Sequence, residues 1–163
     1  MKKIITALLC ALTLLALAAC GNASAHPGDE ENAQTVNPFI DCETMQDAAS
    51  VSGFDMTVPD RVDGYSSRTI QAVKDEMIQV SFLNEGKEIY IRKAVGSEDV
   101  SGDYNQYEEV NTATVGECEV AVKGNGGLIS VATWTKRGYT YAIGMGGNGI
   151  SLEDVTALVE VVC

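Results

Sequence analysis

Residues 78–91, IQVSFLNEGKEIYI, decide the fold. Apolar side chains stand at every second position on both sides of the turn sequence NEGK, residues 84–87. The alternating positions are Ile78, Val80, Phe82, Ile89 and Ile91. Side chains of a strand point alternately to its two faces, so this pattern predicts two half-buried strands joined as an antiparallel hairpin.

The same two-residue period recurs in both directions along the chain. The segments with this pattern are residues 54–58, 65–72, 118–122, 128–135 and 139–143. Short turn sequences rich in Gly and Asn separate the later ones, and neighbours joined by short connections pair antiparallel. The sequence therefore predicts an antiparallel β-meander.

A helix is expected at each end of this meander. Near the N-terminal end, Asp41 is the predicted cap of a short helix that ends at Gly53 and has Cys42 on its apolar face. At the C-terminal end, Ser151 precedes a helix over residues 152–162. Its apolar stripe is Leu152, Val155, Leu158, Val159 and Val162. The fold class is α+β, with both helices packed on one face of the sheet.

The N-terminal region predicts export and lipidation. Residues 1–19 have a basic start and an apolar run too short to span a bilayer, as in a secretory signal peptide. The sequence LAAC, residues 17–20, resembles the bacterial lipobox, whose Cys receives a diacylglycerol, so Cys20 is the predicted lipidation site. Residues 20–37 then form a flexible acidic tether, and residues 38–163 one domain. The alternative is an ordinary signal peptide cut near Ala19 or Ala25.

The charge of the chain limits its partners. The 163 residues carry a net charge of −12, and 9 basic against 23 acidic residues remain beyond residue 19, a net of −14. Nucleic-acid binding rests on neutralising phosphates, so we expect no such partner. We expect a cationic protein or peptide instead. The candidate interaction loop comprises Glu98, Asp99, Asp103, Tyr104, Glu108 and Glu109.

Catalytic chemistry has few suitable groups. His26, the single His, lies in the predicted tether, so His-based nucleophilic and zinc sites have no His in the domain. We expect no enzyme activity, no cofactor and no metal, and a carboxylate-based hydrolase is the least favoured class. Two motifs have weaker functional interpretations. Residues 144–149 match GxGxxG without a βαβ unit, and residues 99–105 have the alternating oxygens of a calcium loop without its Gly and Glu.

Three Cys remain after processing, in a compartment that permits disulfides. Cys42 and Cys163 lie on the inner sides of the two predicted helices, so a disulfide between them is expected, with Cys118 a small buried hydrophobe. The alternative is three reduced thiols.

Five segments resemble a known family. They are residues 96–107 (GSEDVSGDYNQY), 120–127 (VAVKGNGG), 131–134 (VATW), 138–143 (GYTYAI) and 151–159 (SLEDVTALV). Together they are similar to domain of unknown function 4367, found in bacterial lipoproteins and anti-sigma-like membrane proteins. The resemblance implies an α+β domain outside the cytoplasm and transfers no catalytic residue.

These observations together favour an extracytoplasmic lipoprotein, anchored to the cell membrane by its N-terminal lipid, that binds or senses a ligand without catalysis. The alternative is a carrier that holds a lipid or apolar peptide in a cleft between sheet and helix.

Overall fold

The computed structural model describes residues 37–163, which form one compact unit. The predicted signal peptide, the lipidation site Cys20 and nearly all of the predicted tether lie outside the described residues.

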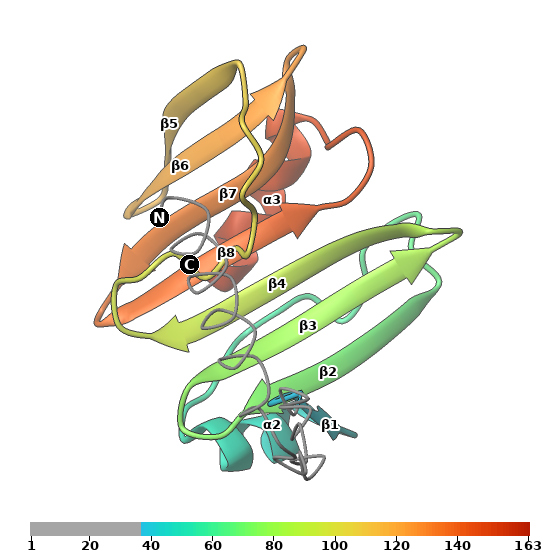
Figure 1. Cartoon of the computed structure of the whole chain (residues 1–163), viewed down its shortest axis with the longest axis vertical. Helices are drawn as coiled ribbons and strands as arrows, with labels where there is room; N and C mark the ends of the chain where they lie inside the picture. Colours follow the sequence, from blue (N-terminus) through green and yellow to red (C-terminus); the bar gives the residue numbers. More distant parts are fainter. Residues whose placement is uncertain (1–36) are drawn as a thin grey trace, which may run out of the picture. The chain divides into compact units, whose positions relative to one another are not determined.

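The domain is built on one antiparallel sheet of eight strands (Figure 1). Their order across the sheet is β1-β2-β3-β4-β8-β7-β6-β5. The strands are β1 (Ile40–Cys42), β2 (Ser67–Val73), β3 (Met77–Asn84), β4 (Lys87–Val95), β5 (Glu109–Val115), β6 (Cys118–Asn125), β7 (Leu128–Lys136) and β8 (Tyr139–Met145). The sheet and its C-terminal helix confirm the predicted α+β class.

The sheet consists of two four-stranded meanders rather than the single meander predicted. In the centre β4 pairs with β8, from Ile89 opposite Met145 to Val95 opposite Tyr139. The connection between β4 and β5, residues 96–108, crosses the sheet in front of β8, β7 and β6 in Figure 1. This crossing brings β5 to the far edge and leaves β8 to continue the sheet from β4.

One face of the sheet, which we call the inner face, carries the core. The hairpin of residues 78–91 supplies its centre, because Ile78, Val80 and Ile91 have no exposed surface and Phe82 and Ile89 have 1%. Ile143 on β8 continues this layer opposite Ile91. The alternating apolar residues of the sequence are therefore the ones buried on the inner face, as predicted.

Helix α3 (Leu152–Val162) covers the β5–β8 half of the inner face and lies behind the sheet in Figure 1. The hydroxyl of Ser151 accepts a hydrogen bond from the backbone N–H of Asp154, which confirms the predicted cap. Val155 and Val159 are buried against the sheet, whereas Leu152 is 47% exposed and does not belong to the buried stripe.

Helix α2 (Met45–Ser52) packs on β2 and β3. Its N-cap is Thr44 and not Asp41, because Thr44 and Asp47 form a reciprocal capping box. Cys42 consequently lies outside the helix, in strand β1, opposite Ile70 of β2.

Two other segments differ from the prediction. Residues 54–58 form no strand of the sheet, although Met56 is 7% exposed and belongs to the core. Their apolar and polar residues alternate because the segment is extended, with Phe54, Met56 and Val58 facing the core and the residues between them facing solvent. Strand β5 was not predicted, because three of its seven residues are Asn or Thr and its apolar Val110 is 63% exposed at the sheet edge.

Candidate functional site

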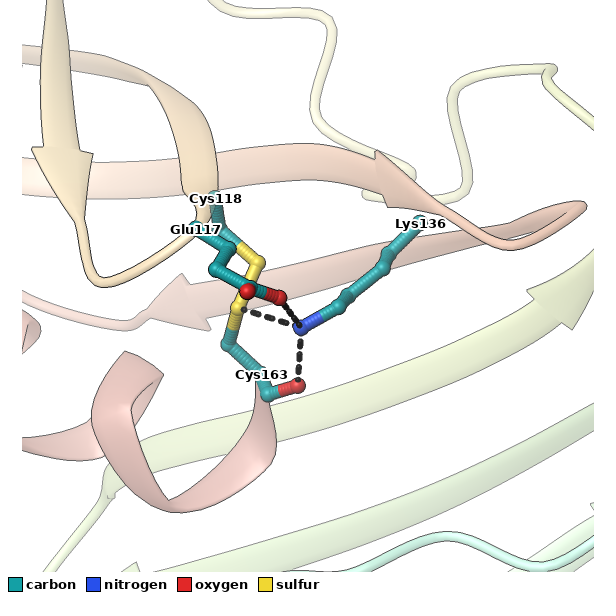
Figure 2. Close-up of a disulfide and its surroundings, with 4 residues drawn as sticks. All are labelled: Glu117, Cys118, Lys136 and Cys163. Atoms are coloured by element: carbon teal, nitrogen blue, oxygen red, sulfur yellow. Dashed lines mark hydrogen bonds and ion pairs between the residues drawn. A yellow bond between two sulfur atoms is a disulfide. The ribbon is translucent and has the colours of Figure 1, made fainter.

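The structure contains a disulfide between Cys118 and Cys163 (Figure 2). The predicted pairing of Cys42 with Cys163 is therefore wrong, and so is the prediction that Cys118 is an unpaired hydrophobe. Cys42 has a free thiol, and burial together with the carboxylates of Asp47 and Asp41 raises the pKa of that thiol. It has no feature of an activated cysteine.

The order of the strands explains why Cys42 does not pair with Cys163. Cys42 lies on β1 at one edge, whereas Cys163 ends α3 over the opposite half. Six strand spacings separate β1 from β6, about 29 Å at roughly 4.8 Å each. A disulfide needs Cα atoms within about 7 Å. The prediction that both helices pack on one face suggested that the two Cys are close. The sequence did not show how far apart the two helices lie across the sheet.

Lys136 completes the surroundings of the disulfide. Figure 2 shows its ammonium beside the C-terminal end of α3, where it donates to the carbonyl oxygen of Cys163 at 2.9 Å. It also lies 3.7 Å from the carboxylate of Glu117. A cation at the end of a helix stabilises the terminal carbonyls, so this group fastens the last turn of α3 to the sheet. We assign it a structural role.

The predicted interaction loop, residues 98–109, lies on the outer face, opposite α3. Two residues of β4 hold it there. The hydroxyl of Tyr90 donates to the carbonyl of Ser101 at 2.6 Å, and the guanidinium of Arg92 donates to the carbonyls of Val100 and Ser101 at 2.9 and 2.8 Å. Ser101 is 1% exposed. The centre of the loop is thus docked on the sheet by side-chain hydrogen bonds to its backbone.

Sequence reasoning missed Tyr90 and Arg92 because they occupy the polar-facing positions of an alternating strand. One signal was present at Gly144, which pairs with Tyr90 across β4 and β8. A Cβ atom at Gly144 would lie 1.9 Å from the Tyr90 ring, so only glycine leaves room for that ring. Arg92 stacks on the ring with its guanidinium carbon 4.4 Å from the centroid.

The calcium-like alternation of residues 99–105 encodes three successive turns. The Asp99 carboxylate accepts from the Ser101 N–H, the Ser101 hydroxyl from the Asp103 N–H, and the Asp103 carboxylate from the Asn105 N–H. Short polar side chains commonly bond the backbone two residues ahead in this way. Among residues 37–163 no group of three or more His, Cys, Asp or Glu is placed to hold a metal ion.

The turns also affect the ionisation of the two aspartates. Partial burial opposes ionisation of Asp99, but the hydrogen bonds from Ser101 and the charge of Lys123 outweigh it, so the pKa of Asp99 is lowered. For Asp103 the hydrogen bonds from Tyr107 and Asn105 likewise outweigh burial and lower its pKa. Both carboxylates are thus charged at neutral pH and occupied within the loop.

The remaining members of the loop point outward. Tyr104 is 95% exposed, and Glu98 and Glu108 are exposed. Glu109 begins β5, where its carboxylate accepts from the N–H of Gly127 at 3.1 Å. The structure therefore divides the six predicted residues into two groups. The carboxylates of Asp99, Asp103 and Glu109 accept hydrogen bonds from backbone N–H groups, whereas the side chains of Glu98, Tyr104 and Glu108 have no hydrogen bond or ion pair within residues 37–163.

A second candidate site is a cleft beside α3, which we call the α3 cleft. It has a volume of about 490 Å³ and lies between residues 59–65 and the helix. Its apolar lining includes Val62, Ile89, Ile150 and Leu158. Val155 and Val159 are buried against the sheet, so the cleft runs beside the helix and not beneath it.

Two glycines of the GxGxxG match lie where a side chain would clash with a neighbouring residue. Gly144 accommodates Tyr90, and a Cβ atom at Gly149 would lie 2.5 Å from the carbonyl oxygen of Ile129. Gly149 precedes Ile150, which forms an isolated antiparallel bridge with Ile129. Gly144 therefore leaves room for the Tyr90 ring on β4, and Gly149 allows the connection from β8 to α3 to pass close to β7.

Neither helix within residues 37–163 has both the length and the hydrophobicity needed to cross a bilayer.

No family model, curated protein or solved structure matches this chain. The resemblance to domain of unknown function 4367 stays a hypothesis.

Proposed function

We propose that this protein is an extracytoplasmic lipoprotein, anchored to the cell membrane through a lipid on Cys20, whose domain binds a cationic protein or peptide through the loop of residues 98–109 without catalysing a reaction. The observation that carries the binding proposal is the presentation of Tyr104, which is 95% exposed in a loop held by three side-chain-to-backbone turns.

An exposed aromatic residue on an ordered loop suits protein recognition. Tyr is among the residues that contribute most to interfaces, and a loop that is ordered before binding loses less entropy on association. Glu98 and Glu108 are exposed in the same loop and add negative charge. Beyond residue 19 the chain carries a net charge of −14, from 9 basic and 23 acidic residues, which accelerates the approach of basic partners and repels acidic ones.

The anchor is supported by the LAAC sequence at residues 17–20, which closes an apolar run of suitable length. A diacylglycerol supplies two acyl chains, enough for stable membrane attachment.

The anchor is tested with Cys20→Ser, with Cys10→Ser as the matched control. We expect the first variant to accumulate at precursor mass and to lose the lipid, and the control to be processed normally. Intact-mass measurement of membrane and soluble fractions reads both properties. Membrane-bound C20S at its normal mature mass contradicts the anchor and leaves the binding proposal standing.

The binding surface is tested by placing a photo-crosslinking amino acid at Tyr104 in living cells, with the same group at Lys74 in the exposed turn between β2 and β3 as the control. We expect a defined adduct from position 104 that is absent from position 74, and a crosslinked partner with a basic surface. Glu98→Lys together with Glu108→Lys is expected to remove it. Equal crosslinking at both positions contradicts the proposed surface.

A further inference from the structure

We propose that the α3 cleft is a second binding site, separate from the loop of residues 98–109, and that it takes a peptide segment in which a bulky apolar side chain adjoins a Lys or Arg. The inference goes beyond the proposed function, because it concerns the inner side of the sheet and another part of the partner.

The shape of the cleft favours an apolar group. Its volume of about 490 Å³ falls within the roughly 300–1,000 Å³ range of small-ligand sites. Ile89 of β4 is 1% exposed and Leu158 of α3 is 8% exposed, so both are packed rather than mobile. Val161 lies on the rim with 45% exposure. Ile89 and Leu158 thus form a packed floor, and the apolar surface still exposed to water belongs to Val161 and to the half-buried Val62, Tyr65 and Ile150. An apolar side chain that enters removes that surface from water.

The charged side chains at the rim of the α3 cleft favour a cationic group on the ligand. Asp63 comes from the turn before β2, and Asp154 lies in the first turn of α3. Both side chains are exposed, and neither has a salt-bridge partner within residues 37–163. Among the described residues that line the cleft, Arg61 is the single basic one.

The rim therefore has two carboxylates against one guanidinium, on a chain of net charge −12. A free fatty acid or an anionic lipid meets net repulsion here, whereas a Lys or Arg beside the bound apolar group meets attraction. A peptide that alternates apolar and basic residues meets both requirements at once.

The probe is a fluorescein-labelled peptide of three Leu-Lys repeats, and its binding to the full lipidated protein in phosphatidylcholine nanodiscs is followed by fluorescence anisotropy. Empty nanodiscs provide the background. Peptides of three Leu-Glu and three Ser-Lys repeats test the charge and the apolar requirement separately. We expect saturable binding of the Leu-Lys peptide and at least ~10-fold weaker binding of the other two.

Two variants locate the bound peptide. Ala157→Trp fills the cleft from an exposed position of α3, and Gln46→Trp, at an exposed position of α2, is its matched control. We expect the first to weaken the Leu-Lys peptide at least ~10-fold and the control to leave it unchanged. Asp63→Lys leaves two cations and one carboxylate at the rim, so we expect this variant to bind the Leu-Glu peptide more tightly than the Leu-Lys peptide. Circular dichroism and the unfolding midpoint verify that each variant is folded.

Tyr104→Ala separates this inference from the proposed function, because it removes the exposed aromatic side chain of the outer loop and leaves the α3 cleft intact. We expect the preference for the Leu-Lys over the Ser-Lys peptide to persist in this variant. Loss of binding in Tyr104→Ala, with retention in Ala157→Trp, assigns the peptide to the outer loop and overturns the cleft site. Preference for Leu-Glu in the unmodified protein, or equal binding of Ser-Lys, overturns it as well.

Discussion

The two halves of the sheet are built alike but covered differently. The short helix α2 packs on β1, β2 and β3, whereas the amphipathic helix α3 packs on β5 and β7. The extended segment that includes Met56 packs between them, with Phe54 against Tyr139 of β8 and the carbonyl of Asp55 bonded to Lys93 of β4. The second half also has a disulfide between α3 and β6, and the first half has the free thiol of Cys42. A disulfide therefore links helix to sheet in one half, whereas non-covalent contacts hold the covering segments in the other.

The largest expected difference concerns the cysteines. Cys163→Ser opens a loop that spans 45 positions in sequence, which the chain-entropy model values at about 4 kcal/mol of unfolding free energy. Cys42→Ser breaks no disulfide, and its hydroxyl can donate to the carbonyl of Ile40 as the thiol does, so it is expected to cost less than about 1 kcal/mol. Denaturant unfolding of both variants measures the difference.

Peptide mapping without reduction tests the same pairing directly. We expect a crosslinked pair of peptides that contains Cys118 and Cys163, and alkylation of Cys42 alone among these three. A Cys42–Cys163 crosslink in the unreduced protein contradicts the structure.

The next largest loss of stability is expected from truncating core side chains in the segments that cover the two halves of the sheet. Met56 and Leu158 are 7% and 8% exposed, so truncation of either to Ala is expected to cost about 3 kcal/mol. Met56→Leu is the volume-conserving control, expected to cost less than about 1.5 kcal/mol. Equilibrium unfolding decides whether the extended segment is as much a part of the core as α3 is, and a loss below about 1 kcal/mol for Met56→Ala shows that it is not.

The helix caps give a smaller effect. Thr44→Ala removes the capping box of α2, and Ser151→Ala removes the cap of α3, each at a cost of about 1 kcal/mol. Ser50→Ala is the control, because its hydroxyl donates within α2 to the carbonyl of Gln46 and takes no part in capping. Thermal unfolding midpoints rank the three, and a Ser50→Ala loss equal to that of Thr44→Ala contradicts the assigned cap.

The smallest effect is a pH dependence confined to the outer loop. The pKa values of Asp99 and Asp103 are lowered in the folded protein, so their ionisation stabilises the loop above the ordinary aspartate value of about 4. That contribution disappears as the pH falls through the lowered values. We expect the amide protons of Ser101 and Asn105 to lose protection from exchange at acid pH before those of β3 do. Equal loss in the loop and in β3 contradicts a local effect.

Much of the fold was predictable because local patterns report burial directly. The period of two in the hairpin of residues 78–91 and the apolar stripe of α3 each identify one buried face. The strand β5 and the cap at Thr44 were less predictable. An edge strand buries little, and two acceptable caps, Asp41 and Thr44, lie three residues apart. Asp47 selects Thr44 through the capping box.

The candidate sites were predictable to a smaller extent. The acidic loop was recognisable from composition. Which of its carboxylates accept hydrogen bonds from backbone N–H groups depends on the folded chain, as for Glu109, which accepts from the distant Gly127. Arg92 and Tyr90 reach the loop only because β4 and the crossing connection overlap in space. The α3 cleft has no sequence pattern of its own, since it joins residues 59–65 to a helix about 90 positions later.

Local sequence patterns were sufficient for three features: the central hairpin, the C-terminal helix with its Ser151 cap, and the acidic character of the chain. Tertiary structure alone decided the pairing of β4 with β8, and with it which cysteine meets Cys163. The physical reason is range. Periodicity and capping are contacts between residues a few positions apart, whereas strand order and disulfide pairing depend on how a thirteen-residue connection crosses the sheet.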